Sequence, residues 1–179
     1  MISQSIARRY AKALLAIGQE DGNYVRYGEE LAGFAQVMDQ AGLAETLANP
    51  LYPLDNRRQI LRRILERLSP SKIVENFLLL IMDKGRMQLV GPIFDYYRKL
   101  VDQVNNIERA TITSAAALPD ATQAQVRRSL EQLTGKTILL DAREDAEIIG
   151  GLIAQVGDLT LDGSVKTQLR NLKESLIKG

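Results

Sequence analysis

The spacing of apolar residues changes near residue 105, and this change limits the possible folds more than any other feature of the sequence. Before it, apolar residues recur at intervals of about three to four positions, which is the spacing of helices that bury one face. After it, polar and apolar residues alternate, as in Ala110-Thr111-Ile112-Thr113-Ser114, which is typical of a half-buried strand. We therefore predict two domains, an all-helical one over residues 1–105 and a small mixed one over residues 106–179.

Residues that cannot continue a helix divide the first domain into six predicted segments. Gly22-Asn23 ends the first helix, and the two prolines of Asn49–Pro53 lack the amide donor that a helix interior needs. We expect Ser69 to cap the fifth helix, with Pro70 in its first turn. The predicted helices cover residues 2–19, 24–40, a short turn or helix up to 47, 55–68, 71–84 and 87–104.

The second domain is predicted to combine strands with two helices. The first of these helices places Val126, Leu130 and Leu133 on one inward face. The second carries a narrow stripe of one apolar residue per turn, formed by Val165, Leu169, Leu172 and Leu176. The predicted strands cover 107–115, 137–141, 152–156 and 159–161, and the helices cover 120–134 and 164–178. The predicted fold is mainly α, with an N-terminal six-helix bundle followed by a small α/β (α+β) C-terminal domain.

The sequence contains neither cysteine nor histidine, which removes several kinds of chemistry at once. Disulfides, thiolate metal sites and cysteine nucleophiles are excluded, and a serine nucleophile has no histidine to activate it. The commonest metal ligand is also missing. We therefore predict that the protein is not an enzyme and uses no metal, cofactor or small-molecule substrate. A catalytic pair of carboxylates in the second domain stays open, because only a pocket would reveal it.

Net charge and the longest apolar run argue against nucleic acid and lipid as direct partners. The formal net charge is +1, which gives no strong field over the whole surface. The longest uninterrupted apolar run, Phe77–Met82, is far shorter than the roughly 20 residues that cross a bilayer. No apolar segment followed by a cleavage site begins the sequence, so we predict no signal peptide and no membrane span.

The predicted helix over 55–68 is rich in arginine. Its apolar residues occupy roughly 140° of the helix circumference, and four of the five arginines spread over much of the remainder. That distribution favours a solvated outer face over a stripe that binds nucleic acid, which we keep as the alternative function. The arginines are Arg57, Arg58, Arg62, Arg63 and Arg67.

The glycines near the C-terminus do not form a phosphate-binding loop, because neither Gly-x-Gly-x-x-Gly nor Gly-Lys-Ser/Thr occurs there. Gly150-Gly151 precedes an apolar strand, so we predict a tight turn or a close approach of two backbones. The acidic residues over 141–147 lack the spacing of a calcium loop and are predicted to form a polar loop.

Two helices of the first domain are more apolar than a small bundle requires. Apolar residues fill roughly 200° around helix 2–19, with Ile6, Tyr10, Ala13 and Ile17 at the centre, and they nearly surround helix 71–84. One interpretation is that an amphipathic helix of another chain covers part of this surface, lying in a shallow groove over two small alanines. The other is that both helices are central in the bundle and nothing docks. The pattern alone leaves both open.

Segments in a fixed order along the chain carry a family resemblance. They are Ala7–Leu14, Leu47–Pro50 with Pro53, Asn76–Leu78, Asp83–Arg86, Ile149–Ile153, Gly157-Asp158, Leu161–Val165, Gln168-Leu169 and Leu172. Taken together they resemble F-type ATP synthase delta subunits and their mitochondrial counterpart, the oligomycin-sensitivity-conferring protein. Lys166-Thr167 departs from the Arg-Gly that the family often has there.

The resemblance implies a non-catalytic peripheral-stalk (stator) subunit that couples proton-driven rotation to ATP synthesis. Its N-terminal domain would bind the N-terminal helix of an alpha subunit of the F1 head, and its C-terminal domain would meet the b subunits of the stalk. The complex would hold it peripherally at the cytoplasmic face of the bacterial inner membrane. The implied groove for the alpha helix, between the first and fifth helices, is walled by Ala7, Tyr10, Ala11, Leu14, Phe77 and Leu80. The implied structural motif consists of Gly150, Gly151, Gly157, Asp158, Asp162, Gly163 and Ser164.

Overall fold

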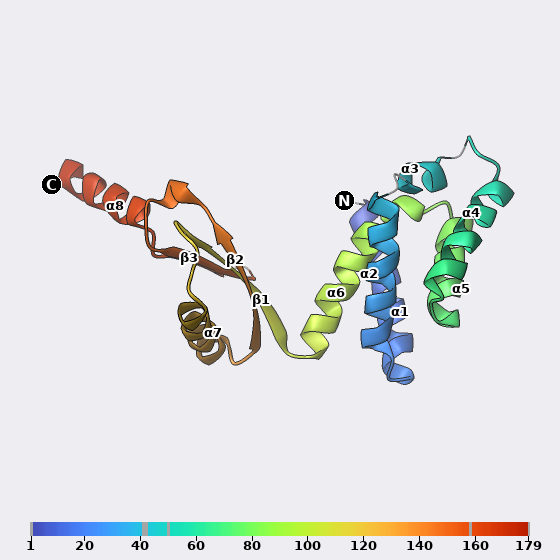
Figure 1. The fold of residues 1–179 in the computed structure, drawn as a ribbon, viewed down its shortest axis with the longest axis horizontal. Helices are drawn as coiled ribbons and strands as arrows, with labels where there is room; N and C mark the ends of the chain where they lie inside the picture. The colour runs from blue at the N-terminus through green and yellow to red at the C-terminus, as the bar shows by residue number, and fades with distance from the viewer. Residues whose placement is uncertain (1, 41–42, 50, 158, 179) are drawn as a thin grey trace. The chain divides into compact units, whose positions relative to one another are not determined.

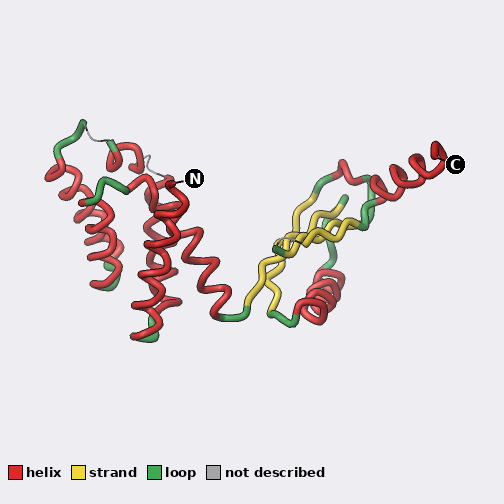
Figure 2. Tube along the Cα trace, turned by 180° about the vertical axis from the view of Figure 1, so that it is seen from behind, coloured by secondary structure: helices red, strands yellow, loops and turns green. Residues whose placement is uncertain are grey.

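The computed structural model describes residues 2–40, 43–49, 51–157 and 159–178. Two compact units, 1–101 and 102–179, pack separately, and the division falls inside helix α6 (Val90–Val104). Helices build the first unit, while the second combines a sheet with helices (Figures 1 and 2). The predicted order, a helical bundle followed by a small α/β unit, is confirmed.

Apolar faces at helical spacing form the helices of the first unit, and Gly22, Pro53, Pro70 and Gly85 lie between successive helices. The elements are α1 (Ile2–Glu20), α2 (Tyr24–Gln40), α3 (Leu43–Ala48), α4 (Leu54–Leu68), α5 (Lys72–Asp83), the 3₁₀ helix η1 (Met87–Leu89) and α6. In Figure 1, α1 lies beside α2, and α4 lies beside α5. The predicted helix over 87–104 begins as η1 and becomes α-helical at Val90.

Helices α2, α5 and α6 contribute large, fully buried side chains to the core of the helical unit. Phe34 comes from α2, Leu78 and Ile81 come from α5, and Tyr97 comes from α6. Removing each such side chain from water contributes about 1.5–3 kcal/mol to folding. The hydroxyl of Tyr97 donates a hydrogen bond to the carbonyl oxygen of Tyr24 at 2.8 Å, which satisfies its polar group. Burial raises the pKa of Tyr97.

The turn between α4 and α5 corrects one prediction, because Ser71 rather than Ser69 caps α5. The hydroxyl of Ser71 accepts from the amide of Val74 at 3.5 Å. Ser69 instead ends α4 in the left-handed conformation, with φ 46°, since the residue before a proline is disfavoured in the right-handed helical region. Glu30 of α2 accepts from the amide of Ser71 at 2.9 Å and from its hydroxyl at 2.7 Å, so the start of α5 is tied to α2.

The second unit is built on a sheet of four strands in the order β2-β1-β3-β4. Strands β1 and β2 are parallel and joined through α7, whereas β3 pairs antiparallel with both β1 and β4. The predicted polar loop over 141–147 is wrong in part, because β2 continues to Glu144 and a 3₁₀ turn follows. The elements are β1 (Ile107–Ser114), α7 (Asp120–Thr134), β2 (Thr137–Glu144), η2 (Ala146–Ile148), β3 (Leu152–Val156), β4 (Leu159–Asp162) and α8 (Val165–Lys178).

Helix α7 covers one face of this sheet (Figure 1). The small core between them consists of Ala110, Leu130, Ile138 and Val156. Leu133 was predicted to face inward but is 62% exposed. It lies in the last turn of α7, and of the predicted inward residues only Val126 and Leu130 pack against the core.

Candidate partner-binding surfaces

Helix α1 buries a different line of residues from the one predicted as its centre. Ala7, Ala11 and Leu14 have almost no exposed surface and belong to the core. Ala13 is exposed, and the side chain of Ile17 is 43% exposed. The two alanines therefore pack inside the unit instead of forming the floor of an open groove. The apolar line that α1 leaves exposed is the neighbouring one that contains Ala13 and Ile17.

Helix α5 is apolar nearly all round, and the bundle does not hide all of it. Leu80 is 46% exposed although it lies one turn after the buried Phe77. The core side of the helix is formed by Val74, Leu78, Ile81 and Met82. An exposed leucine beside the buried apolar residues of the same helix agrees with the physical argument that another chain covers part of α5.

Tyr10 connects α1 with the end of α5. Its ring meets that of Phe77 edge-on, with centroids 6.1 Å apart and an interplanar angle of 71°. Arg86, which follows α5, donates a hydrogen bond from Nη1 to the Tyr10 hydroxyl at 2.8 Å, and its guanidinium carbon lies 5.6 Å from the ring centroid. These contacts fix the orientation of a half-buried aromatic ring. We call Tyr10 of α1 and Leu80 of α5, the accessible neighbours of Phe77, the α1–α5 surface.

The six residues predicted to wall the alpha groove fall into two groups. Ala7, Ala11, Leu14 and Phe77 are buried, so their side chains support the surface from beneath. Tyr10 is half-buried and Leu80 exposed, so these two are accessible. Sequence analysis missed the role of Arg86, because no periodic pattern shows that a residue beyond the end of α5 reaches back to α1.

The glycines of the C-terminal motif form a joint between β3 and the start of α8. Gly151 has φ 78°, and an added Cβ there would collide with the carbonyl oxygen of Gly163. The amide of Gly163 donates to the carbonyl oxygen of Leu152 at 3.0 Å, and the amide of Val165 donates to that of Gly150 at 3.0 Å. The predicted close approach of two backbones is confirmed, and it fixes the point at which α8 leaves the sheet.

Asp162 and Ser164 complete this joint by capping α8. The Asp162 carboxylate accepts from the amide of Ser164 at 2.9 Å and from the hydroxyl of Thr167 at 2.8 Å. The hydroxyl of Ser164, which is buried, accepts from the amide of Thr167 at 3.2 Å. The hydrogen bonds from Ser164 and then Thr167 lower the pKa of Asp162. The first turn of α8 is therefore held by side chains as well as by backbone.

The rest of the predicted motif lies between β3 and β4. Gly157 has φ 56°, a conformation that favours glycine, and the carboxylate of Glu108 lies beside it. Asp158 lies outside the described residues. Gly157 therefore serves the turn between the two strands and has no part in the joint that holds α8.

Beyond its first turn, α8 extends away from the sheet (Figure 1). Leu169, Leu172 and Leu176 are each more than half exposed, and only Val165 at the base is half-buried. We call these four residues the α8 stripe. The three leucines are aligned on one side of the helix, and the described part of the unit leaves this apolar line uncovered.

The arginines of α4 do not form one exposed surface. Arg57 is buried, and its Nη1 donates to the carbonyl oxygen of Leu47 at 3.2 Å. Arg58 pairs with Asp83 of α5 at 2.8 Å. The three that remain on the outer face are Arg62, Arg63 and Arg67. Because two of the five arginines hold the unit together, the case for nucleic-acid binding loses part of its basis.

A catalytic pair of carboxylates in the second domain would need a hollow lined by acidic side chains. A hollow of about 390 Å³ between α7 and the β3–β4 pair is lined by apolar and neutral polar side chains, including Val126, Gln125 and Leu161. Within the described ranges no group of three or more acidic side chains is placed to hold a metal ion. None of the helices in the described part of the chain is both long and apolar enough to cross a membrane.

These features describe a protein of two small units, each of which leaves apolar side chains exposed on at least one helix. A family model described as "ATP synthase delta (OSCP) subunit" matches residues 6–176. The chain belongs to this family.

Relatives along the whole chain carry the same description. The ATP synthase subunit delta of Desulfosudis oleivorans is 47% identical over 175 residues, which is 97% of this chain and 96% of the relative. That of Desulforapulum autotrophicum is 39% identical over 180 residues, covering 100% and 98%. A chain in the cryo-EM structure of the Toxoplasma gondii mitochondrial ATP synthase hexamer superimposes with a TM-score of 0.70 at 19% identity, covering 96% and 97% of the two chains. At that identity the likeness shows the fold alone.

Proposed function

We propose that this chain is the peripheral-stalk (stator) subunit of an F-type ATP synthase and links the F1 head to the b-subunit stalk. The observation that carries the proposal is that each of two separately packed units leaves an apolar helix surface uncovered. A linker between two partners needs two such surfaces and has no need of an active site. The relatives named ATP synthase subunit delta support this assignment.

The partner of the helical unit is, on this proposal, the N-terminal helix of an alpha subunit. An amphipathic helix lying across the α1–α5 surface would cover Leu80, which the bundle leaves exposed, and the accessible part of Tyr10. Tyr10 presents a large ring whose orientation Arg86 and Phe77 already fix, so little side-chain freedom is lost on binding. Buried Ala7, Ala11 and Leu14 would hold α1 in place beneath it.

The partners of the α/β unit are, on the same proposal, the b subunits, with α8 as the contact. Torque on the head requires a connection that does not yield, so the contact needs affinity and stiffness. The joint of Gly151, Gly163 and Asp162 supplies stiffness at the base of α8. In the assembled enzyme the chain would lie peripherally at the cytoplasmic face of the inner membrane.

A titration of the whole chain with an N-terminal peptide of its own alpha subunit tests the proposal. We expect nanomolar-class binding, and a loss of more than tenfold when Leu80→Glu puts a charge into the apolar contact. Because Leu80 is 46% exposed, the midpoint of urea unfolding should change little. Leu133→Glu, at a leucine of the other unit that is 62% exposed, is the matched control and should bind normally.

Two outcomes of this titration would contradict the proposal. One is a chain that is folded by circular dichroism and shows no interaction with the peptide. The other is a Leu80→Glu protein that binds as tightly as the unmodified chain. Equal losses in the Leu80→Glu and Leu133→Glu proteins would point to general damage by a surface charge and would also count against a specific α1–α5 site.

A further inference from the structure

The α8 stripe has the spacing of a coiled-coil seam. Its members follow one another at intervals of four, three and four residues, which places them on one narrow line along the helix. A helix that packs on a sheet or in a bundle core has a broader apolar face, as α5 does. A line of one apolar residue per turn suits a single partner helix whose own apolar residues recur at the same spacing.

The two sides of this stripe differ in charge. On one side lie Lys166, Arg170 and Lys173, which follow one another at intervals of four and three residues and so form a parallel line. On the other side lie three neutral polar residues at the same kind of spacing, namely Gln168, Asn171 and Ser175. The positions directly beside a coiled-coil seam select the partner by charge, and here they are Lys166 and Lys173 on one side and Gln168 and Ser175 on the other. Arg170 lies next to the two lysines, one step further from the seam, and adds to the same basic side. This seam is therefore basic on one flank only.

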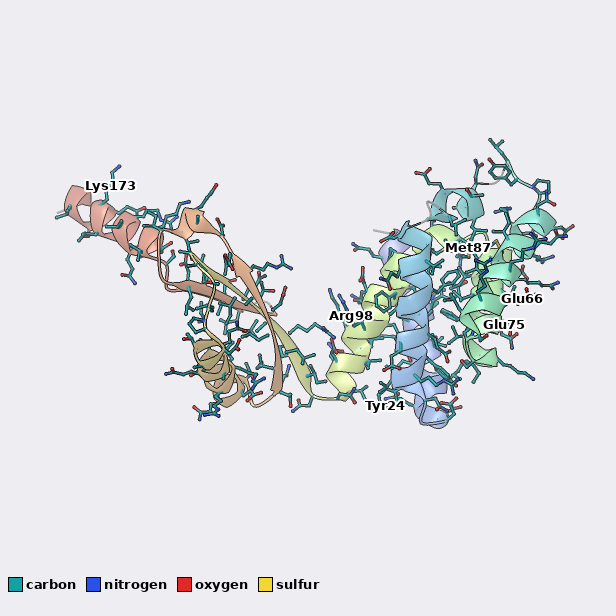
Figure 3. The ribbon with its side chains drawn as sticks, viewed as in Figure 1. Tyr24, Glu66, Glu75, Met87, Arg98 and Lys173 are labelled. Carbon is teal, nitrogen blue, oxygen red and sulfur yellow. The ribbon has the colours of Figure 1, made fainter. Side chains whose placement is uncertain are left out.

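The basic flank is available to a partner. Lys173 lies on the part of α8 that extends beyond the sheet (Figure 3). Lys166 faces Glu147 at 3.7 Å, but both side chains are more than half exposed, so water competes with this pair and it is weak. Arg170 lies close enough to Asp162 to contribute to the lowered pKa of that carboxyl. Neither contact covers the leucines.

We infer that α8 binds a partner helix with a heptad-spaced apolar line and acidic residues along one flank, opposite Lys166, Arg170 and Lys173. The inference rests on the proposed function for the origin of this helix, which would be the end of a b subunit. Contact between the leucine lines supplies most of the affinity, while the acidic flank fixes the orientation and register of the partner.

Two other occupants fit the stripe less well. A membrane surface would favour a basic helix with a wide apolar face and large aromatic residues, and α8 has a narrow face without aromatics. An antiparallel second copy of α8 would set its basic flank against an identical one, which is unfavourable. Both remain as outcomes of the experiment below.

The test is a titration of the whole chain with the soluble part of the b subunits from its own organism. Arg170→Glu with Lys173→Glu reverses the flank and leaves every stripe leucine in place. We expect this double variant to bind roughly tenfold more weakly at low salt, with a smaller difference at high salt, where charges are screened. Both substitutions keep good helix formers, so the helical circular dichroism should not change.

The matched control is Arg62→Glu with Arg63→Glu on α4, which changes the net charge equally in the other unit and should bind normally. A second variant, Leu169→Ala with Leu172→Ala, shortens the stripe and should reduce binding at both salt concentrations. The alpha-peptide titration is run on every variant, and we expect it to be unaffected by changes in α8.

Each contrary result has a distinct meaning. If the charge reversal leaves binding unchanged, the partner helix does not carry the inferred acidic flank. The proposed function still stands in that case, provided that the unmodified chain binds the b subunits. If neither α8 variant affects binding to b, α8 is not the contact. Flank-dependent binding to phosphatidylcholine–phosphatidylglycerol vesicles, or self-association of the chain alone that the leucine variant abolishes, would also overturn the inference. Absence of any binding to b by the unmodified chain would contradict the proposed function itself.

Discussion

Arg57 shows how one charged side chain can hold together two helices that follow each other along the chain. It is buried, with its Nε donating to the carbonyl oxygen of Tyr52 at 3.1 Å and its Nη1 to that of Leu47 at 3.2 Å. Leu47 lies in the last turn of α3, where carbonyl groups lack helical partners and carry partial negative charge. The guanidinium thereby joins the end of α3, the proline-containing segment after it and the first turn of α4.

Replacing this arginine should destabilise the helical unit. Arg57→Met keeps much of the volume but leaves two carbonyl groups without donors, so we expect a loss of about 2–3 kcal/mol in the free energy of unfolding. Arg57→Lys retains the charge without the planar fork and should give an intermediate loss. Urea denaturation monitored by circular dichroism measures both effects.

The exposed arginines of the same helix provide the control. Arg63→Met changes an exposed side chain of α4 and should alter the free energy of unfolding by less than about 0.5 kcal/mol. Equal effects at positions 57 and 63 would show that the hydrogen bonds of Arg57 contribute nothing particular to stability.

Replacing glycine by alanine should have opposite effects on stability at two positions of this chain. Gly151 has φ 78° and faces the backbone of Gly163, so Gly151→Ala should lower the stability of the α/β unit by more than about 1 kcal/mol. Gly33 lies within α2, where an added Cβ meets nothing within 4 Å, so Gly33→Ala should raise stability by up to about 1 kcal/mol. Thermal unfolding should show a lower unfolding temperature for Gly151→Ala and a higher one for Gly33→Ala. A stabilising Gly151→Ala would contradict the proposed joint.

The helices and strands were predictable because their signals are local. The change of apolar spacing near residue 105, the proline-rich segment after α3 and the glycine pair before β3 each determine the backbone within a few residues of themselves. The close approach at Gly151 followed from the same kind of evidence, since only glycine fits two backbones in contact.

Predictions that depended on packing between elements were less accurate. Helix α1 carries adjoining apolar lines, and periodicity does not say which of them faces the core. The family resemblance implied that Ala7 and Ala11 wall a groove, but both are buried. The inward placement of Leu133 failed because the sheet under α7 is small. Arg57 and Arg86 act on segments far from them in sequence, and no pattern in one helix reveals such contacts.

At the scale of the whole chain, the sequence encodes two cores that do not share residues. One lies among the helices of the first unit and the other between α7 and the sheet. Each unit can therefore hold its own binding surface without the other. The α1–α5 surface is a few accessible apolar residues on a well-packed bundle, whereas the α8 stripe is a line of leucines on a helix that leaves its unit. On the proposed function, each unit binds a partner of its own.

The central claim is that this chain physically connects the F1 head to the b-subunit stalk, and a bridging measurement tests it most directly. The soluble b stalk is immobilised, and F1 lacking its own delta subunit is added. The amount of F1 head retained is then measured with the unmodified chain, with the Leu80→Glu variant and with the Leu169→Ala, Leu172→Ala variant. We predict that the head is retained only with the unmodified chain. The Leu80→Glu variant should still bind to the stalk, and the Leu169→Ala, Leu172→Ala variant should still bind the alpha peptide. Retention of the head by the Leu80→Glu protein, or equal retention without any added chain, would contradict the account.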